Sequence, residues 1–263
     1  MKPPSPAVAA MPVLVVEGLE RAFGGVRAVD GVSFTVASGE RVALIGPNGA
    51  GKTTCFNLID GQLTPDEGRV TIGGTDVTAR PTRERARRGV GRTFQVAASF
   101  ASMTVRENVA LAIAAHEGAT ASPVGAGLGA YDARADALLA RVGAAELAGE
   151  HAAILAYGDL KRVELALALA GEPRLLLMDE PTAGMAPRER GAMMDVVSAL
   201  VRERSIALLF TEHDMDVVFA HADRIVVLDR GRILAQGAPD AIRADRRVQE
   251  AYLGTDDDTP TDR

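Results

Sequence analysis

The stretch "GPNGAGKT", from Gly46 to Thr53, decides the fold of this 263-residue chain. It matches the phosphate-binding pattern G-x-x-x-x-G-K-[ST] and stands between an apolar run, Val42 to Ile45, and a helical pattern that ends near Gly61. Glycines let successive backbone N–H groups converge on phosphate, and the following helix adds about half a positive charge at its N-terminus. A chance glycine-rich turn would not require this strand, turn and helix context. We therefore expect a nucleoside triphosphate site, in which Lys52 reaches the β- and γ-phosphates and Thr53 ligates Mg²⁺. The loop residues expected to contact the nucleotide are Gly46, Pro47, Asn48, Gly49, Ala50, Gly51, Lys52, Thr53 and Thr54.

Two other strand ends carry groups that suit phosphate chemistry. "LLLMDE" places Asp179 and Glu180 after an apolar strand, where a carboxylate is unfavourable unless it meets a cation such as Mg²⁺. Asp179 would hold the ion, and Glu180 would act as general base on the attacking water, a role worth about 10² to 10⁴ in rate. Alternatively, both acids only cap the helix after Pro181. His213 follows another apolar strand, "LLF". Ligands gather at the carboxyl ends of parallel strands, so we expect His213 to contact the γ-phosphate rather than to be structural.

The hydrophobic pattern predicts the class of fold. "VLVVEGLERAF" and "GVSFTVASGERVALIG" mix β-branched runs with turn residues and predict strands and hairpins. Residues 103–116 and 131–142 carry apolar residues at helical spacing, and the small, glycine-rich segment 117–130 between them is expected to be a loop. Three short apolar strands then alternate with helical patterns, as in a parallel sheet. The sequence therefore predicts an α/β protein.

Composition restricts the class of protein further. The chain is 47% hydrophobic with a net charge of -6, which permits a sizeable core and disfavours nucleic-acid binding through overall basicity. Cys55 is the only cysteine, which excludes an intramolecular disulfide, and we expect it in the core. No stretch approaches the roughly 18 uncharged apolar residues of a membrane-spanning helix. Residues 1–12 are expected to form a flexible leader, and 255–263 a disordered acidic tail.

Taken in chain order, these motifs resemble those of the ATP-binding cassette (ABC) ATPases, and the resemblance runs from about Val13 to Gly254. The spelling "LAYGD", with "GRTFQ" ending at Gln95 and "TEHDMDVV" around His213, looks most like the ATP-binding subunit of branched-chain amino acid importers. Each motif of the family has a counterpart in this sequence. The aromatic loop looks like Phe23, Walker A like Gly46 to Thr53, the Gln loop like Gln95 and the signature like Leu155 to Asp159. Walker B looks like Leu175 to Asp179 followed by the glutamate Glu180, the D-loop like Ala183 to Ala186 and the switch histidine like His213.

The resemblance implies a P-loop NTPase (RecA-like) core with an N-terminal antiparallel β subdomain and an inserted α-helical subdomain. The first part of the core would then comprise 13–95, the helical subdomain with the signature 96–165, and the second part of the core 166–254. It also implies that two subunits pair head to tail, so that the signature of one covers the ATP held by Walker A of the other. Gly158 and Tyr157 would act in trans, Gly158 through its backbone N–H, and the helix beginning near Asp159 would point its positive end at phosphate.

Two further site residues rest on the resemblance. Phe23 would stack on adenine, although the residue alone could equally be a core aromatic. Gln95 would touch Mg²⁺ or the attacking water; otherwise it is an ordinary turn glutamine. The implied catalytic residues are thus Glu180, His213 and Gln95, and the implied metal ligands are Thr53, Gln95 and Asp179.

The signature departs from the commoner family spelling Leu-Ser-Gly-Gly-Gln at two positions. Ala156 lacks a hydroxyl that would donate to the γ-phosphate, which removes a charge-assisted bond of roughly 1.5 to 3 kcal/mol. Asp159 adds a negative charge, which about 4 Å from phosphate would be unfavourable by some 4 kcal/mol at an effective dielectric near 20. We therefore expect Asp159 to cap its own helix or to pair with Lys161 or Arg162.

Other signals have competing interpretations. An arginine cluster that shares one short segment with Glu84 and has no interleaved aromatic residue favours a solvated helix face over nucleic-acid binding. Phe94, Phe100 and Met103 lie where the family's helical subdomain receives a short helix of the membrane subunit, and core packing explains them equally well. The cluster comprises Arg80, Arg83, Arg85, Arg87, Arg88 and Arg92.

The sequence thus predicts an ATPase subunit of an importer, peripheral on the cytoplasmic face of the inner (plasma) membrane, with ATP and Mg²⁺ as cofactors. Its partners would be a second ATPase subunit, identical or related, two transmembrane permease subunits and, indirectly, an external substrate-binding protein, with no nucleic acid. The expected transported substrates are branched-chain or other hydrophobic amino acids, and the alternatives are urea or amides and aromatic carboxylates. A non-transport ABC ATPase acting on ribosomes or DNA is disfavoured by the single cassette without heptads. A small-molecule phosphotransferase would leave the signature and Glu180 unexplained.

Overall fold

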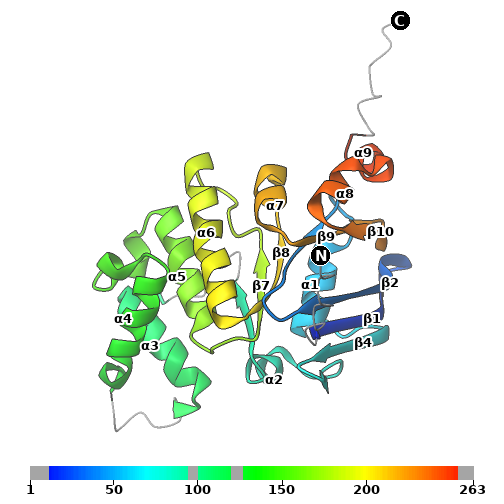
Figure 1. The fold of residues 1–263 in the computed structure, drawn as a ribbon. Helices are drawn as coiled ribbons and strands as arrows, with labels where there is room; N and C mark the ends of the chain where they lie inside the picture. Colours follow the sequence, from blue (N-terminus) through cyan, green and yellow to red (C-terminus); the bar gives the residue numbers. More distant parts are fainter. Residues whose placement is uncertain (1–11, 94–99, 120–126, 254–263) are drawn as a thin grey trace, which may run out of the picture.

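A computed structural model describes residues 12–93, 100–119 and 127–253, which form two sheets and a group of helices (Figure 1). The smaller sheet is antiparallel, with strand order β2-β1-β4-β5. Alternate residues of its long strands, such as Leu14 and Val16 or Phe34 and Val36, are buried, as expected for a sheet with one face on the core. Its strands are β1 (Pro12–Phe23), β2 (Val26–Ala37), β4 (Glu67–Ile72) and β5 (Thr75–Asp76).

The larger sheet has the order β10-β9-β3-β8-β7-β6, and β3, β6, β7, β8 and β9 run parallel, whereas β10 is antiparallel to β9. Every residue of β7 and β8 is buried, which explains their continuous apolar runs. These strands are β3 (Arg41–Ile45), β6 (Val90–Thr93), β7 (Leu175–Asp179), β8 (Ala207–Thr211), β9 (Arg224–Asp229) and β10 (Arg232–Gly237).

The two faces of this sheet contribute to two hydrophobic cores. Leu175 and Leu177 pack with α1 (Lys52–Asp60) and the antiparallel sheet, whereas Leu176 and Met178 pack with α6 and α7 on the opposite face. Cys55 is fully buried in the first core, and burial raises the pKa of its thiol to about 12, so it is the core residue that the sequence predicted. The remaining helices of the core are α2 (Thr82–Ala86), α6 (Pro187–Arg204), α7 (Met215–His221), α8 (Pro239–Ala244) and α9 (Arg246–Leu253).

The middle of the chain is helical, and its helices lie together at one end of the molecule, drawn in green in Figure 1. α3 (Val105–His116) begins with a capping box, in which Thr104 and Glu107 exchange hydrogen bonds. Buried apolar residues of α3, α4 (Asp132–Arg141) and α5 (Tyr157–Leu169) share one core. Short 3₁₀ turns join them at Leu128–Tyr131, Ala145–Leu147 and Ala152–Ile154.

The arginine cluster does not form one solvated helix face, because two of its members are buried or nearly so. Arg85 is 1% exposed and donates to the carbonyl oxygens of Leu58, Ile59, Thr78 and Arg80 at 2.6 to 2.9 Å. Arg92 lies in β6 and pairs with Asp60 at 3.0 Å. The solvated interpretation is thus wrong for these two. Arg80, Arg83, Arg87 and Arg88 are exposed, but only Arg83 of these lies within α2.

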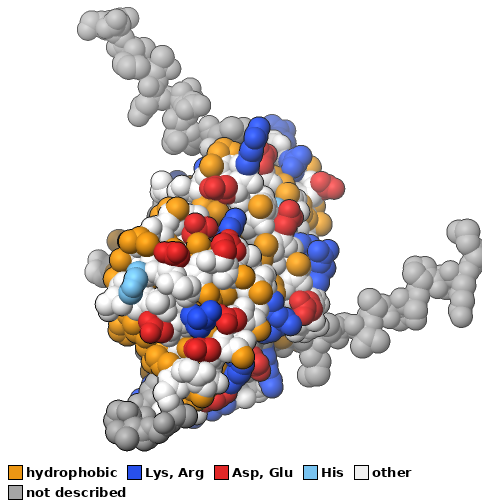
Figure 2. Space-filling model, turned by 90° about the vertical axis from the view of Figure 1, so that its left-hand side faces the viewer, with side chains coloured by type: hydrophobic (Ala, Val, Ile, Leu, Met, Phe, Trp, Pro, Cys, Tyr) orange, Lys and Arg blue, Asp and Glu red, His pale blue; other side chains and the backbone are white. Residues whose placement is uncertain are grey.

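Charged side chains of both signs are interspersed with hydrophobic ones on the face that carries α3 and α4 (Figure 2). Arg106 on α3 pairs with Asp136 on α4 at 2.7 Å, which is one example of this mixing. The pattern on this face is typical of an ordinary solvated surface.

Candidate functional site

The phosphate loop joins β3 to α1, as the sequence predicted, and its glycines are required by close backbone approaches. A Cβ on Gly46 would lie 2.2 Å from the carbonyl oxygen of Leu228, and one on Gly51 would lie 2.2 Å from that of Ala28. Gly51 also has a φ of 101°, in the left-handed region that favours glycine. The loop is therefore wedged between β9 and β2, and its shape is fixed by the neighbouring backbone.

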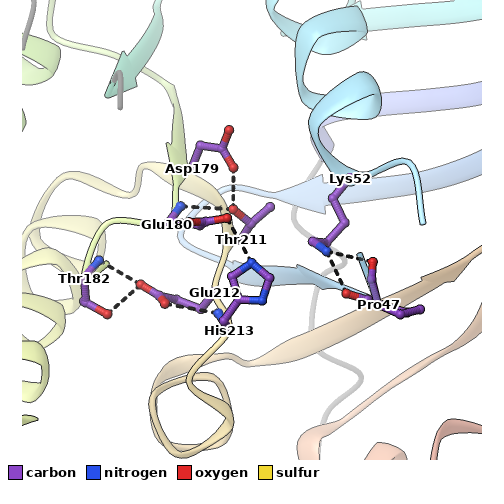
Figure 3. A network of polar contacts seen from close by, with 9 residues as sticks. Pro47, Lys52, Asp179, Glu180, Thr182, Thr211, Glu212 and His213 are labelled. Atoms are coloured by element: carbon purple, nitrogen blue, oxygen red, sulfur yellow. Dashed lines mark hydrogen bonds and ion pairs between the residues drawn. The ribbon is translucent and has the colours of Figure 1, made fainter. Parts of the chain in front are cut away.

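Lys52 lies inside this loop at the N-terminus of α1. Its side chain is 9% exposed, and Nζ donates to the carbonyl oxygens of Gly46 at 2.6 Å and Pro47 at 3.1 Å (Figure 3). Burial lowers the pKa of Lys52, while the carboxylates of Glu180 and Asp179 oppose that shift. The ammonium is therefore held at the loop by hydrogen bonds that a phosphate could replace.

Asp179 ends β7 beside Thr211, which ends the neighbouring strand β8. The Thr211 hydroxyl donates to Asp179 Oδ1 at 2.6 Å and accepts the backbone N–H of Glu180 at 3.0 Å. One hydroxyl thus fixes two acidic residues that are adjacent in sequence. Asp179 is buried, so its carboxylate is a hard oxygen group set in a restricted position close to the phosphate loop.

Glu180 and His213 contact each other across the ends of β7 and β8. His213 Nε2 lies 3.0 Å from Glu180 Oε1, and both side chains are partly exposed (Figure 3). Glu180 has a φ of 50°, a left-handed conformation that is strained for a residue with a side chain and is frequent at functional sites. The imidazole is therefore placed to orient the carboxylate that the sequence suggested as a general base.

Glu212 is a site residue that the sequence did not single out. It is buried, and its Oε1 accepts the backbone N–H and the hydroxyl of Thr182 at 2.8 and 2.7 Å. Its Oε2 accepts the backbone N–H of His213 at 3.3 Å. Glu212 therefore ties the segment after Glu180 to the segment that carries His213. The signal that could have found it was an acid directly after an apolar strand, the same pattern that drew attention to Asp179.

A pocket of about 230 Å³ brings the two groups of predicted residues together. Glu180 and His213 line it opposite the phosphate loop. Gly46, Pro47 and Asp179 lie next to it through the hydrogen bonds given above. Its other lining residues are Ala28, Asn48, Gly49, Ala50, Gly51, Lys52, Thr53 and Thr54.

The signature segment lies elsewhere in the chain. Leu155 to Asp159 do not line this pocket, and α5 begins at Tyr157, slightly before the start expected near Asp159. Tyr157 is 47% exposed, and its ring lies against Gly184 in the predicted D-loop. Asp159 lies 3.5 Å from Arg162, as expected, while Lys161 pairs instead with buried Glu164 at 2.9 Å.

Phe23 does not line the pocket. Phe23, at the end of β1, is 45% exposed, and the guanidinium of Arg21 lies 5.0 Å from its ring centroid. An exposed aromatic ring at that place can accept a stacking partner, and it is not the core residue of the alternative interpretation. Gln95 lies outside the described residues, as does Phe94.

Among the described residues, no helix is long and apolar enough to cross a membrane. Within the same ranges, no group of three or more His, Cys, Asp or Glu side chains could hold a metal ion unaided. Thr53, which lines the pocket, and Asp179 beside it could hold a magnesium ion together with phosphate oxygens and water.

Comparisons with known proteins agree with this geometry. Residues 29–183 match the family model of the ABC transporter, and residues 232–258 match that of the branched-chain amino acid ATP-binding cassette transporter. The chain is 40% identical over 253 residues to the high-affinity branched-chain amino acid transport ATP-binding protein LivG of Salmonella typhimurium, covering 92% of this chain and 98% of LivG. It is 39% identical to BraF of Pseudomonas aeruginosa, a protein of the same description, with the same coverage. The ATP-binding cassette MJ1267 in its ADP conformation superposes with a TM-score of 0.82 at 32% identity, covering 94% of this chain and all of that one.

Proposed function

The chain belongs to the ABC transporter family of ATP-binding proteins, and from this premise we propose that it is the ATP-hydrolysing subunit of an importer for branched-chain amino acids. The observation that carries the proposal is the convergence of the phosphate loop, Glu180 and His213 on one pocket. The match of residues 232–258 to the branched-chain amino acid transporter model supports the cargo, because the remainder of the cassette is common to many transporters.

Each residue of the site has a role in the proposed hydrolysis. Lys52 exchanges its two carbonyl partners for oxygens of the β- and γ-phosphates, and the loop N–H groups bind the remaining oxygens. Glu180 accepts a proton from the attacking water, and His213 orients its carboxylate or contacts the γ-phosphate. Thr53 and Asp179 would hold Mg²⁺, which would neutralise charge on the phosphates. Gln95 is proposed to touch the ion or the water, and Phe23 to stack on adenine.

A head-to-tail dimer completes the site in this proposal. The signature does not line the chain's own pocket, so Gly158 and Tyr157 would reach a nucleotide only from a second subunit. The first turn of α5 then directs its free N–H groups and partial positive charge at the γ-phosphate. In this proposal ATP binds the closed dimer more tightly than the open one, and hydrolysis removes this difference in affinity. Such a difference is required if ATP is to drive movement of the membrane subunits.

An apolar groove beside β6 supports docking of a membrane subunit. Phe100, which is exposed, lines this groove of about 420 Å³ with Leu111, Leu167 and other residues of α3 and α5. An exposed apolar groove is typical of a protein interface. We propose that each of two permease subunits inserts a short helix there. The chain would then be peripheral at the cytoplasmic face of the membrane and would contact an external binding protein only indirectly.

Co-purification tests this function. The tagged chain is isolated from gently solubilised membranes of its own cells, and its partners are identified by mass spectrometry. Two multi-spanning subunits with an external binding protein are expected, and that binding protein should bind leucine, isoleucine or valine in calorimetry. If the binding protein prefers urea, amides or aromatic carboxylates, the proposed cargo must be changed to that compound. Ribosomal or DNA-bound partners would contradict the proposed importer function. A Lys52→Ala chain provides the control for nucleotide-dependent association.

A further inference from the structure

A second polar pocket, of about 360 Å³, lies at the opposite edge of the parallel sheet. We call it the arginine pocket; its charged lining consists of Arg87, Arg88, Arg174, His116 and Glu172. Arg174 directly precedes β7, whereas Asp179 ends that strand. At about 3.3 Å per residue, five strand residues separate the two ends by roughly 15 Å. The arginine pocket is therefore distinct from the phosphate loop and its residues.

The charges of this pocket are unbalanced. Several arginines of the chain have acidic partners, such as Arg80 with Glu84 at 3.1 Å. Within the described ranges, Arg87, Arg88 and Arg174 belong, like Arg83, to the arginines for which no carboxylate lies at ion-pair distance. Glu172 contributes the single carboxylate of the lining. α3 and α5 end beside the pocket and add about half a negative charge each. Three guanidiniums exceed these contributions, so the pocket stays positive in a chain whose net charge is -6.

Glycines lie against two of the side chains that line the pocket, Arg174 and His116. A Cβ on Gly89 would lie 3.3 Å from Cγ of Arg174, and the backbone N–H of Arg174 donates to the Gly89 carbonyl at 2.8 Å. A Cβ on Gly171 would come within 2.9 Å of His116 Nδ1. The stem of Arg174 and the ring of His116 thus lie close to glycine backbone, while both residues remain exposed and open to a bound anion.

We propose that the arginine pocket binds a soluble phosphorylated small molecule that carries at least two negative charges. Guanidinium groups match phosphate oxygens in a planar, two-pronged geometry, and three of them suit more than one charge. The volume is at the lower end of the range found for small-molecule sites, which fits a compact anion. Its lining comes from the β4–β5 turn, the α2–β6 turn and the ends of α3 and α5, so an occupant would link the antiparallel sheet, the core and the helical region.

The test titrates pyrophosphate by calorimetry into the full chain carrying Lys52→Ala, which weakens binding at the phosphate loop. We expect one remaining site, whose affinity falls at least tenfold when Arg88→Glu is added. Arg83→Glu is the matched control. Arg83 is exposed, lies two residues before buried Arg85 and does not line the pocket. Its replacement by glutamate changes the net charge by the same amount as Arg88→Glu. Thermal unfolding of each variant checks that the fold is intact.

Three outcomes would overturn the proposal. Pyrophosphate could fail to bind the Lys52→Ala chain, or Arg83→Glu could weaken binding as much as Arg88→Glu, which would indicate general charge attraction. A lipid headgroup offers the same phosphate chemistry, so sedimentation with phosphatidylglycerol vesicles is compared for the two variants. Equal sedimentation supports a soluble ligand, whereas a loss confined to Arg88→Glu would assign the pocket to lipid. None of these measurements depends on the chain being a transporter subunit.

Discussion

The ring of Tyr157 rests on the backbone of Gly184. A methyl group on Gly184 would come within 2.9 Å of Tyr157 Cε1, and the glycine has a φ of 77°. Tyr157 belongs to the predicted signature and Gly184 to the predicted D-loop, so these two segments, which are far apart in sequence, are in direct contact within one subunit. The contact offers a path by which a change at one motif displaces the other.

Replacing Gly184 by alanine should displace the Tyr157 ring. Gly74 has the same φ of 77°, and a methyl group added there would have nothing within 4 Å, so Gly74→Ala measures the backbone strain alone, about 1 to 2 kcal/mol. Gly184→Ala should lower the free energy of unfolding by at least about 1 kcal/mol more, because the ring must move. Urea unfolding measures both. Adding Tyr157→Ala should remove the excess, and equal losses for the two glycine variants would exclude the steric contact.

Replacing Glu180 by glutamine should abolish turnover without preventing nucleotide binding. The amide keeps the size of the side chain but cannot accept the proton of the attacking water, so phosphate release should fall about 10² to 10⁴-fold. The ATP-bound dimer should then persist and be visible in size-exclusion chromatography. Glu67→Gln, an exposed carboxylate on β4, serves as control. Turnover by Glu180→Gln within a few-fold of the original chain would contradict the general-base role.

Asp214 should make stability depend on pH in acid. Arg190 donates to it at 2.6 Å and the first N–H groups of α7 bond to it, so the pKa of Asp214 lies below its ordinary value of 3.8. A lowered carboxyl pKa means that the unfolded chain binds more protons, and the resulting stability is present above the ordinary pKa and lost as pH falls through the folded one. The stability difference between the original chain and Asp214→Asn should be constant near pH 6 and shrink below about pH 4. A difference independent of pH would refute this role.

Replacing Arg85 by methionine should destabilise the protein strongly. Its guanidinium satisfies four carbonyl oxygens in a nearly buried position, and methionine would leave those acceptors without their donor. We expect a loss of roughly 3 kcal/mol or more in the free energy of unfolding. Arg83→Met, two residues earlier and exposed, should stay within about 0.5 kcal/mol. Similar losses for both would show that the buried hydrogen bonds contribute little.

The contrast between Arg83 and Arg85 illustrates where reading the sequence reaches its limit. The phosphate loop, β7 and β8 were predictable because their patterns are local: a glycine-rich turn between a strand and a helix, and apolar runs followed by Asp179 and Glu180 or by His213. The partners of Arg85 lie up to 27 residues away, and the contact between Glu212 and Thr182 spans 30 residues. Local patterns carry no information on such pairings. The burial of Arg85 and the hydrogen bonds of Glu212 to Thr182 and His213 could therefore be seen only in the three-dimensional structure.

Lys52 gives the phosphate loop an internal competitor. The carbonyl oxygens of Gly46 and Pro47 already occupy the ammonium, so arrival of a phosphate is an exchange of partners rather than the filling of a bare charge. The contribution of Lys52 to nucleotide affinity is then the difference between its interaction with phosphate and its interaction with the two carbonyl oxygens, so this contribution is moderate. Release is eased for the same reason, because the departing phosphate is replaced from within the loop. An ATPase that must release ADP once per catalytic cycle benefits from a phosphate loop that restores its own hydrogen bonds.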